Sequence, residues 1–448
     1  MPTELTHREE AGFQHEPPRA SLPEIHRSLN VPRSATFLRK LFAFAGPGFL
    51  IAVGYMDPGN WATDLAAGSK YNYALLSVIM LSNFMAILLQ ALAIKLGVVT
   101  GRDLAQACRE HFSRPVSLTL WVLAEIAIAA CDLAEVIGSA IALNLLFHIP
   151  LLLGVCLTAL DVLLILVLQS KGFRFIEALV VSLIATVSVC FGLEILFSHP
   201  SMTGLVKNFF VPPAQLLHDR EMLYIAISIL GATVMPHNLY LHSAIVQTRN
   251  FDRNARGKRE AIRFGTIDST IALTIALLVN AAILIVSAAT FYSRGYNQVA
   301  EIQDAYKLLS PLLGVGAASA VFALALLASG QNSTLTGTLA GQVVMEGFLN
   351  IRLRPWLRRL ITRGLAIVPA IFVTAFWGER GTANLLVFSQ VILSMQLSFA
   401  VFPLVMFTSD KSKMGEFANA AWLKSLSWVA ALSIAALNGW LLIRLMHT

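Results

Sequence analysis

Long apolar runs, separated by short polar segments, make up most of the chain after residue 40. A helix needs roughly 20 mostly apolar residues to cross the hydrocarbon core of a bilayer. Because backbone groups cannot remain unpaired in lipid, each apolar run of that length is predicted to be a membrane-spanning helix. The pattern predicts eleven such spans, which lie at 44–69, 74–98, 117–147, 151–169, 174–198, 222–248, 264–292, 312–348, 362–377, 384–407 and 421–445.

The composition supports a membrane protein. Hydrophobic residues make up 56% of the 448 residues and charged residues 13%, whereas soluble domains carry about 25% charged residues. The four cysteines are scattered and form no CxxC pair, so neither a disulfide framework nor a zinc site is indicated. Residues 1–36 are polar and rich in Pro, Glu and Arg, and we expect residues 1–40 to form a disordered cytoplasmic tail.

Lysine and arginine residues gather in alternate loops, and this asymmetry predicts the orientation of the chain. Cytoplasmic loops are enriched in Lys and Arg, which places the N-terminus in the cytoplasm. An odd number of spans then places the C-terminus outside, and we expect the cell membrane as the location. These loops account for the net charge of +7, which therefore does not indicate a nucleic-acid partner. The basic loops lie at 102–114, 171–174, 249–263, 352–363 and 411–424.

Two of the spans are interrupted at mid-membrane by proline, glycine and polar residues. The first span contains GYMDPGN at 54–60, and the sixth contains GATVMPHN at 231–238. Each stretch would break an otherwise continuous apolar helix. The predicted helix breaks lie at Pro58, Gly59 and Pro236.

Each break frees a backbone carbonyl. Proline lacks an N–H and clashes with the carbonyl four residues earlier. Pro58 therefore frees the carbonyl of Gly54, and Pro236 frees that of Ala232. Free carbonyls at membrane depth are tolerated only where they line a cavity or meet a ligand. The alternative interpretation is a pair of ordinary proline kinks, which are common in membrane helices.

The two breaks occupy matching positions in two halves of the chain. The first span opens one set of five helices and the sixth opens the next set, which begins from the opposite side of the membrane. Interrupted helices at equivalent places in inverted repeats point to a transporter binding site. The sequence therefore predicts a first repeat at 41–200, a second repeat at 201–410 and an additional helix at 411–448.

The residues at the breaks favour a divalent transition-metal ion as the ligand. Asp57 is an ionisable residue within a span, and such residues are functional candidates by default. Asp57 and Asn60 offer hard oxygen atoms, Ala232 offers a carbonyl and Met235 a thioether. Because a thioether is soft, this mixed set suits Mn²⁺ or Fe²⁺ and tolerates Co²⁺ or Cd²⁺. The alternative for Met235 is simple packing, the usual role of methionine.

These breaks, with a third motif, resemble the Nramp family of metal transporters. The motifs are DPGN at 57–60, MPHN at 235–238 and ASGQNSTLTGTLAGQ at 328–342. The likeness extends from about residue 40 to 445, and it is to the bacterial proton-linked manganese type. The resemblance implies an all-α polytopic membrane protein with a LeuT-like fold, an inverted repeat of five plus five helices and one further helix.

The resemblance also implies a ligand set and a transport cycle. The expected function is import of Mn²⁺, and also of Fe²⁺, Co²⁺ and Cd²⁺, coupled to proton movement by alternating access. No prosthetic group and no protein partner is implied; the partners are metal ions, protons and the bilayer. The family's metal ligands correspond to Asp57, Asn60, the Ala232 carbonyl and Met235, with Gln390 as a further amide near the metal and Gln90 as a weaker candidate.

Small departures from the family pattern lie outside this ligand set. Asn332 stands where the family usually has serine, and Ser398 stands where proline is usual. Ser398 could change the bend of the tenth span. Relatives that handle magnesium or aluminium typically lack the methionine, so Met235 indicates a transition-metal member. Glu177, which follows Arg174, is expected at the membrane interface.

Ionisable residues on the third and sixth spans are candidates for proton coupling. Histidine can gain and lose a proton near physiological pH. The resemblance implies a relay that starts at Asp57 and runs through His237 and Glu135 toward the cytoplasm. The alternatives are a buried structural pair for the two acidic residues and topological anchoring for the arginines. The full candidate set is Asp57, His237, Asp132, Glu135 and His242, with Arg358, Arg359 and Arg363 as counter-charges.

Three other functions compete with metal transport. In a transporter of amino acids or other organic solutes, helix N-termini at the breaks would meet a substrate carboxylate, which Asp57 would repel. An intramembrane enzyme is disfavoured because the sequence contains neither HExxH nor GxSxG. A channel without coupling is disfavoured by the predicted inverted repeat. We therefore expect a transporter and not an enzyme.

Overall fold

The computed structural model describes residues 20–32, 36–160, 172–297, 299, 301–351, 355–377 and 381–446. The first half contains β1 (Leu29–Asn30), α1 (Phe37–Phe44), α2 (Pro47–Gly54), α3 (Pro58–Tyr71), α4 (Leu76–Thr100), α5 (Leu104–His111), α6 (Arg114–Phe147), α7 (Leu151–Leu157), η1 (Thr158–Leu160) and α9 (Phe173–Ser198). The second half contains α10 (Met202–Phe210), α11 (Arg220–Thr233), α12 (Pro236–Ile245), η2 (Val246–Thr248), β2 (Arg249–Asn250), α13 (Ala255–Thr290), η3 (Tyr292–Arg294), α14 (Ile302–Leu313), α15 (Ala318–Leu349), α16 (Pro355–Trp377), α17 (Thr382–Ser409), α18 (Lys411–Met414), η5 (Gly415–Phe417) and α19 (Ala421–Met446).

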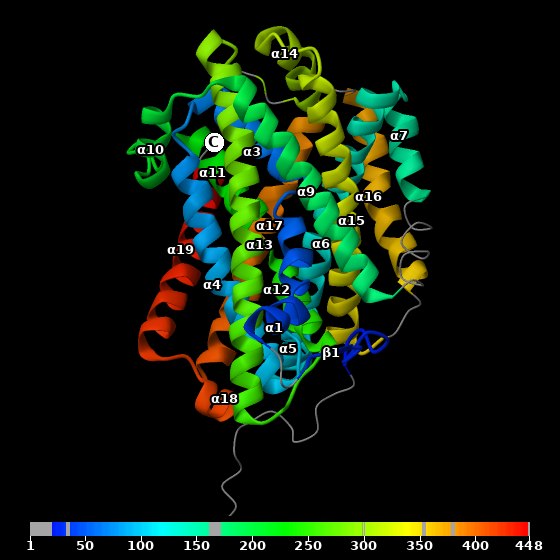
Figure 1. Ribbon diagram of the computed structural model, residues 1–448, viewed down its shortest axis with the longest axis vertical. Coiled ribbons are helices and arrows are strands. Elements are labelled where there is room, and N and C mark those ends of the chain that lie inside the picture. Colours follow the sequence, from blue (N-terminus) through cyan, green and yellow to red (C-terminus); the bar gives the residue numbers. More distant parts are fainter. Residues whose placement is uncertain are drawn as a thin grey trace, which may run out of the picture.

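The helices form an elongated bundle with two ends. Figure 1 shows α7, α10 and α14 at one end, here called the α14 end. It shows α5, α18 and β1 at the other end, here called the α5 end, while the C-terminal end of the chain lies toward the α14 end. The described N-terminal segment and the C-terminus therefore lie at opposite ends of the bundle, as an odd number of crossings requires.

Most of the predicted spans coincide with long apolar helices. Among the described residues, seven helical segments are long and apolar enough to cross a membrane, and α1 with α2, bent by 47°, makes an eighth. The span predicted at 312–348 is α15, whose polar stretch at 329–338 lowers its hydropathy. The span at 362–377 is part of α16. Of the span at 151–169, only α7 and η1 lie within the described residues.

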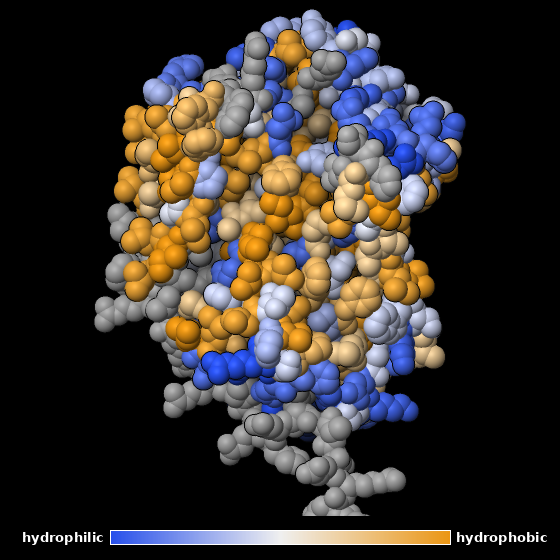
Figure 2. Space-filling view, turned by 180° about the vertical axis from the view of Figure 1, so that it is seen from behind, coloured by the Kyte–Doolittle hydropathy of each residue, from blue (hydrophilic) through white to orange (hydrophobic). Residues whose placement is uncertain are grey.

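An apolar belt lies between the two ends of the bundle, on the face that Figure 2 shows and along the outer helices. Figure 2 shows hydrophobic side chains gathered across the middle of one face, with hydrophilic side chains toward both ends. Large apolar side chains are exposed along the outer helices, for example Val189 on α9, Val368 on α16 and Val429 on α19. Such a continuous apolar surface is unfavourable in water and is typical of contact with lipid. The molecule is a multi-pass membrane protein.

The two predicted helix breaks are confirmed. The first separates α2 from α3, which begins at Pro58 with Asp57 as its N-cap residue. The second separates α11 from α12, which begins at Pro236 with Met235 as its N-cap residue. In Figure 1 the chain ascends from α1 toward α3 but descends from α11 to α12, so the two broken helices run in opposite directions.

A segment at residues 20–32, here called the strap, lies across the α5 end. The Ser21 hydroxyl donates to Asp103 Oδ2 at 2.7 Å, and the Leu22 N–H donates to Glu346 Oε2 at 3.1 Å. Leu29 of β1 pairs in parallel with Arg249 of β2. The expectation of a disordered tail therefore does not describe residues 20–32. Composition did not indicate these contacts because they depend on partners far away in the sequence.

The bend between α1 and α2 is fixed by a buried ion pair. Arg249 donates to Glu177 Oε1 at 2.6 Å and also to the carbonyl of Ala45, which lies at the bend. Gly46 follows with φ of 133°, a value that L side chains rarely adopt, and a Cβ there would lie 2.3 Å from the Glu177 carboxyl carbon. Asp268 accepts from the N–H of Gly48 at 2.7 Å. Glu177 is buried within the bundle, where it pairs with Arg249.

Candidate metal site

Asp57 is positioned by its role as the N-cap of α3. Its Oδ1 accepts from the backbone N–H of Asn60 at 2.8 Å, which satisfies one of the free donors at the start of the helix. Pro58 occupies the first helical position, where a missing N–H costs nothing. The carboxylate is therefore held at the break, at the N-terminal end of a helix whose dipole favours negative charge. Asp57 is 0% exposed.

The amide of Asn60 joins the two broken helices. Its Nδ2 donates to Asp57 Oδ1 at 2.8 Å and to the carbonyl of Ala232, in the other break, at 3.1 Å. The same nitrogen lies 3.5 Å from the carbonyl of Gly54. Both carbonyls that the prolines were predicted to free are therefore turned toward one polar group between the breaks.

The side chains of Met235 and Gln390 lie close to two glycines of the first broken helix. A Cβ at Gly54 would lie 3.2 Å from the Met235 sulfur. A Cβ at Gly59 would lie 1.7 Å from Gln390 Nε2, so the side chain of Gln390 lies directly against the first break. The structure thus brings together all five residues that the sequence proposes as metal ligands. Each of them is at most 1% exposed.

Several buried oxygen atoms around the breaks have no hydrogen-bond partner. The unpartnered carboxylate oxygen Asp57 Oδ2 is accompanied by neutral hydroxyl and amide oxygens. Burying such acceptors without a partner is unfavourable unless a ligand meets them. Hard oxygen atoms of this kind suit a divalent cation. The neutral oxygens are Thr233 Oγ1, Asn238 Oδ1, Asn280 Oδ1 and Gln390 Oε1.

Asn280 on α13 is a site residue that the sequence analysis missed. Its Nδ2 donates to the carbonyl of Tyr55 at 2.8 Å and to Asn60 Oδ1 at 3.3 Å. It therefore fixes both the unwound backbone of the first break and the orientation of the Asn60 amide. The available signal was an asparagine within an apolar run, but nothing in the sequence places that run against the break.

Cys131, which the sequence analysis did not name, lies between His237 and the proton-relay candidates on α6. Cys131 Sγ lies 3.9 Å from His237 Nε2 and 3.8 Å from Glu135 Oε1. Glu135 Oε2 also accepts from the Thr334 hydroxyl at 3.1 Å. Asp132 lies one turn from Glu135 on α6. Both carboxylates lie close to Gly337 of α15, because a Cβ added there would be 3.4 Å from Asp132 Oδ1 and 3.0 Å from Glu135 Oε1. The thiol thus lies between the histidine and the carboxylate.

His242 belongs to a different set of contacts. Its Nδ1 lies 2.9 Å from Gln90 Oε1, and Gln90 Nε2 donates to the Tyr55 hydroxyl at 2.7 Å. Gln90 therefore bridges α12 and the first break, and these two hydrogen bonds connect it to no proposed metal ligand. The side chains of the three candidate arginines lie outside the described residues, although α16, which carries them, packs against α6. These are Arg358, Arg359 and Arg363.

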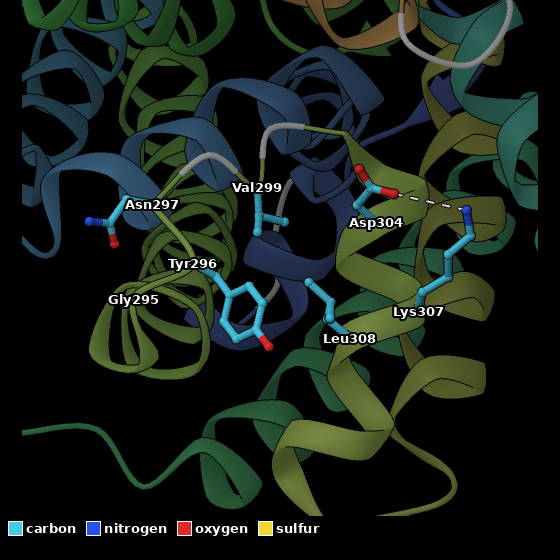
Figure 3. A pocket seen from close by; sticks show the side chains of 7 residues that line it. All are labelled: Gly295, Tyr296, Asn297, Val299, Asp304, Lys307 and Leu308. Carbon is cyan, nitrogen blue, oxygen red and sulfur yellow. Dashed lines mark ion pairs between the residues drawn. The ribbon is translucent and has the colours of Figure 1, made fainter.

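A large surface cavity lies elsewhere, at the α14 end. It encloses about 540 Å³ and is lined by residues of α14 and of the connection between η3 and α14. Figure 3 shows its one carboxylate, Asp304, directed toward Lys307, with an N–O distance of 3.9 Å. No proposed metal ligand lines this cavity. Within the described part of the chain, no three His, Cys, Asp or Glu side chains cluster as a metal site, so a site with one carboxylate needs the neutral donors at the breaks.

The sequence matches the family described as "Natural resistance-associated macrophage protein-like" over residues 48–444. The chain belongs to the Nramp family. The Nostoc sp. protein named "Divalent metal cation transporter MntH" is 66% identical over 426 residues, which are 95% of this chain and 96% of the relative. A Listeria welshimeri protein of the same name is 64% identical over 442 residues, which are 99% and 98% of the two chains.

Solved structures confirm the fold class of this Nramp protein. A manganese transporter of Eremococcus coleocola superposes with a TM-score of 0.86 at 43% identity, covering 94% of this chain and 90% of that one. Mhp1, a nucleobase-cation-symport-1 family transporter, superposes with a TM-score of 0.58 at 15% identity, covering 89% and 92% of the two chains. The second likeness shows the fold alone. The fold is LeuT-like, as the resemblance implied.

Replacing Gly231 by alanine is expected to disturb the site without removing a ligand. The added Cβ would lie 2.1 Å from the backbone oxygen of Gln390, which cannot move as a flexible side chain could. Overpacking of this kind costs about 1–3 kcal/mol, so we expect a lower midpoint of thermal unfolding and slower Mn²⁺ uptake. Gly192→Ala on α9 is the control, because nothing lies within 4 Å of its added Cβ. Equal behaviour of the two variants would contradict the prediction.

Proposed function

We propose that this Nramp protein imports divalent transition-metal ions, Mn²⁺ and also Fe²⁺, Co²⁺ and Cd²⁺, by alternating access coupled to proton movement. The observation that carries this proposal is the meeting of one buried carboxylate, freed carbonyls and a thioether at two opposed helix breaks. The named relatives, divalent metal cation transporters and a manganese transporter, support the same substrate class. We propose transport and no catalytic reaction.

The metal ion would replace the hydrogen bonds that Asn60 now makes. Asn60 Nδ2 currently donates to Asp57 Oδ1 and to the Ala232 carbonyl, so its hydrogen atoms meet the acceptors that would face a cation. When the amide turns, its oxygen joins those acceptors as a ligand. Met235 supplies the soft donor and Gln390 an amide oxygen that has no partner at present. The single carboxylate keeps binding reversible, as transport requires.

The proposed cycle exposes this site to each side of the membrane in turn. We assign the α5 end, with its basic loops and the strap, to the cytoplasm, and the α14 end to the outside. Repeats at 41–200 and 201–410 would supply the two opposed broken helices, with 411–448 as an additional helix. The inside-negative potential favours import, by about 2.3 kcal/mol per charge per 100 mV. We place the protein in the cell membrane.

The proposed proton route leaves the metal site toward α6. It runs from Asp57 to His237 and on to Glu135 and Asp132, with Cys131 lying between histidine and carboxylate. His242 would act beside this route through Gln90, and the arginines of α16 would be counter-charges. A buried carboxylate and histidine in a transporter are typical of proton relays. Separate proton and metal routes allow both ions to move in one cycle.

Met235→Ala tests the proposed metal selectivity. The variant loses the soft donor and keeps every oxygen ligand, so we expect Mn²⁺ uptake by liposomes to become sensitive to excess Ca²⁺ or Mg²⁺ by about tenfold. The intact protein should ignore both competitors. Met345→Ala on α15 is the matched control, because Met345 is also buried but lies outside the breaks. If the intact protein carries Ca²⁺ or Mg²⁺ equally well, or Met235→Ala behaves as wild type, the thioether has no selective role.

A further inference from the structure

A second cavity lies under the strap at the α5 end. It encloses about 360 Å³, and we call it the strap pocket. One wall is the strap itself, with His26 and Arg27. The other walls are the end of α4 at 99–101, Gln247 of η2, and the basic residues Arg253 and Lys258. The pocket therefore joins three parts of the chain that are distant in sequence, and three of its lining side chains are cationic.

The guanidinium of Arg253 has an unused donor in this pocket. Its Nε is buried without a hydrogen-bond partner. The guanidinium carbon lies 4.9 Å from the ring centroid of Phe251, a cation–π contact that restrains the position of the group. A buried, unpaired N–H of a charged group is costly unless a ligand accepts from it. The Arg253 guanidinium is therefore held beside Phe251, and its Nε–H has no hydrogen-bond acceptor.

No described acidic group forms an ion pair with these cations, although the charge of Glu416, the partner of Arg259, acts on Lys258 from farther away. Ion pairs between described residues satisfy other cations at this end, such as Arg259 with Glu416, but none involves Arg27, Arg253 or Lys258. Burial, and then the charge of Arg27, lowers the pKa of Arg253 to about 10, which still leaves it charged at neutral pH. Like charges held together in this way attract an anion strongly.

We propose that the strap pocket binds a phosphate group, either free phosphate or the headgroup of an anionic phospholipid. A guanidinium fork matches phosphate oxygens, and a lysine adds a further charge. The pocket lies at the α5 end, which we assign to the cytoplasm in the proposed function, and anionic headgroups of the cytoplasmic leaflet attract basic protein segments beside the membrane. A phosphate bound there contacts the strap, α4 and α13 together, and so holds the strap against the α5 end.

Thermal unfolding of the full-length protein tests the proposal. One arm adds inorganic phosphate to protein in neutral detergent, with sodium chloride at matched ionic strength as the reference. The other arm compares bilayer discs of phosphatidylcholine with discs that also contain phosphatidylglycerol. We expect the unfolding midpoint to rise in at least one arm, because a ligand that binds the folded state stabilises it. A rise with phosphate identifies the free ion, and a rise only in phosphatidylglycerol identifies the lipid headgroup.

Single variants separate a built site from general charge attraction. In Arg253→Gln and in Arg27→Gln, we expect the half-saturating phosphate concentration, or the required fraction of phosphatidylglycerol, to rise at least about tenfold. Arg27 is exposed, so its variant is expected to fold even if Arg253→Gln does not. Arg256→Gln removes the same charge from an exposed side chain of α13 outside the pocket and should leave the response unchanged. No rise in either arm, or an equal effect of all three variants, would overturn the proposal.

Discussion

Replacing Asp57 by asparagine is expected to reduce Mn²⁺ binding and uptake on the order of 100-fold, the effect of losing about 2.7 kcal/mol of interaction with a charged group. Asparagine has nearly the same shape, and its oxygen can still accept from the N–H and the side-chain amide of Asn60 as Asp57 Oδ1 does. The substitution therefore keeps the N-cap and removes the charge and the unpartnered oxygen Oδ2. Calorimetric Mn²⁺ binding in detergent and uptake by liposomes measure the two effects.

The matched control for this variant is Asp219→Asn. Asp219 caps α11 by accepting from the N–H groups of Glu221 and Met222, so it has the same structural role as Asp57. It lies at the far end of α11 from the break and contacts no proposed ligand. We expect wild-type uptake from Asp219→Asn. Uptake by Asp57→Asn within twofold of that control would show that Asp57 acts only as a helix cap.

The parts of the site that could be predicted from sequence depend on local rules. Proline at 58 and 236 must interrupt its own helix and free a carbonyl four residues earlier, whatever surrounds it. The pair Asp57 and Pro58 also predicts, from local sequence alone, an N-cap residue followed by proline at the first helical position. The structure has both breaks and both free carbonyls at the expected places. The position of Met235 next to a break was likewise evident from the sequence, and its role as a metal ligand stays a prediction.

The parts that could not be predicted depend on which helices pack together. Asn280 and Cys131 are single polar or weakly polar residues in apolar runs, and only the packing of α13 and α6 around the breaks gives them partners. The strap has the composition of a disordered segment, yet Asp103 and Glu346 supply acceptors from distant helices. Periodicity and propensity describe a helix by itself and contain no information about its neighbours.

Glu177 illustrates the same limit and controls the α5 end of the first broken helix. It follows the basic residues Lys171 and Arg174, which indicated the membrane interface, but nothing in the sequence indicated that Arg249 from the second half of the chain pairs with it. Arg249 also donates to the carbonyl of Ala45, at the bend between α1 and α2. The ion pair therefore connects the second broken helix, which ends just before Arg249, to the start of the first. In the proposed transport cycle, opening of this end would require the ion pair to break.

Glu177→Gln is expected to destabilise the protein by about 3 kcal/mol, because it removes the carboxylate that pairs with the buried charge of Arg249 and leaves only the more distant charge of Asp268. Arg249 is 0% exposed and the Glu177 side chain 3%. Glu416→Gln is the matched control, since it breaks an ion pair with Arg259 whose side chains are 65% and 50% exposed. Exposed pairs of this kind contribute less than about 1 kcal/mol. The midpoint of thermal unfolding in one detergent measures both variants.

The two possible outcomes distinguish a structural from a gating role for the ion pair. If Glu177→Gln lowers the unfolding midpoint far more than Glu416→Gln, the buried ion pair stabilises the bend between α1 and α2 at Ala45. We then expect the α5 end of Glu177→Gln to open more readily, so that a cysteine-reactive reagent applied from that end labels buried Cys108 of α5 faster than in wild type. Equal midpoints and equal labelling would mean that the hydrogen bonds of Arg249 to Thr248 and Ala45 suffice to hold the bend.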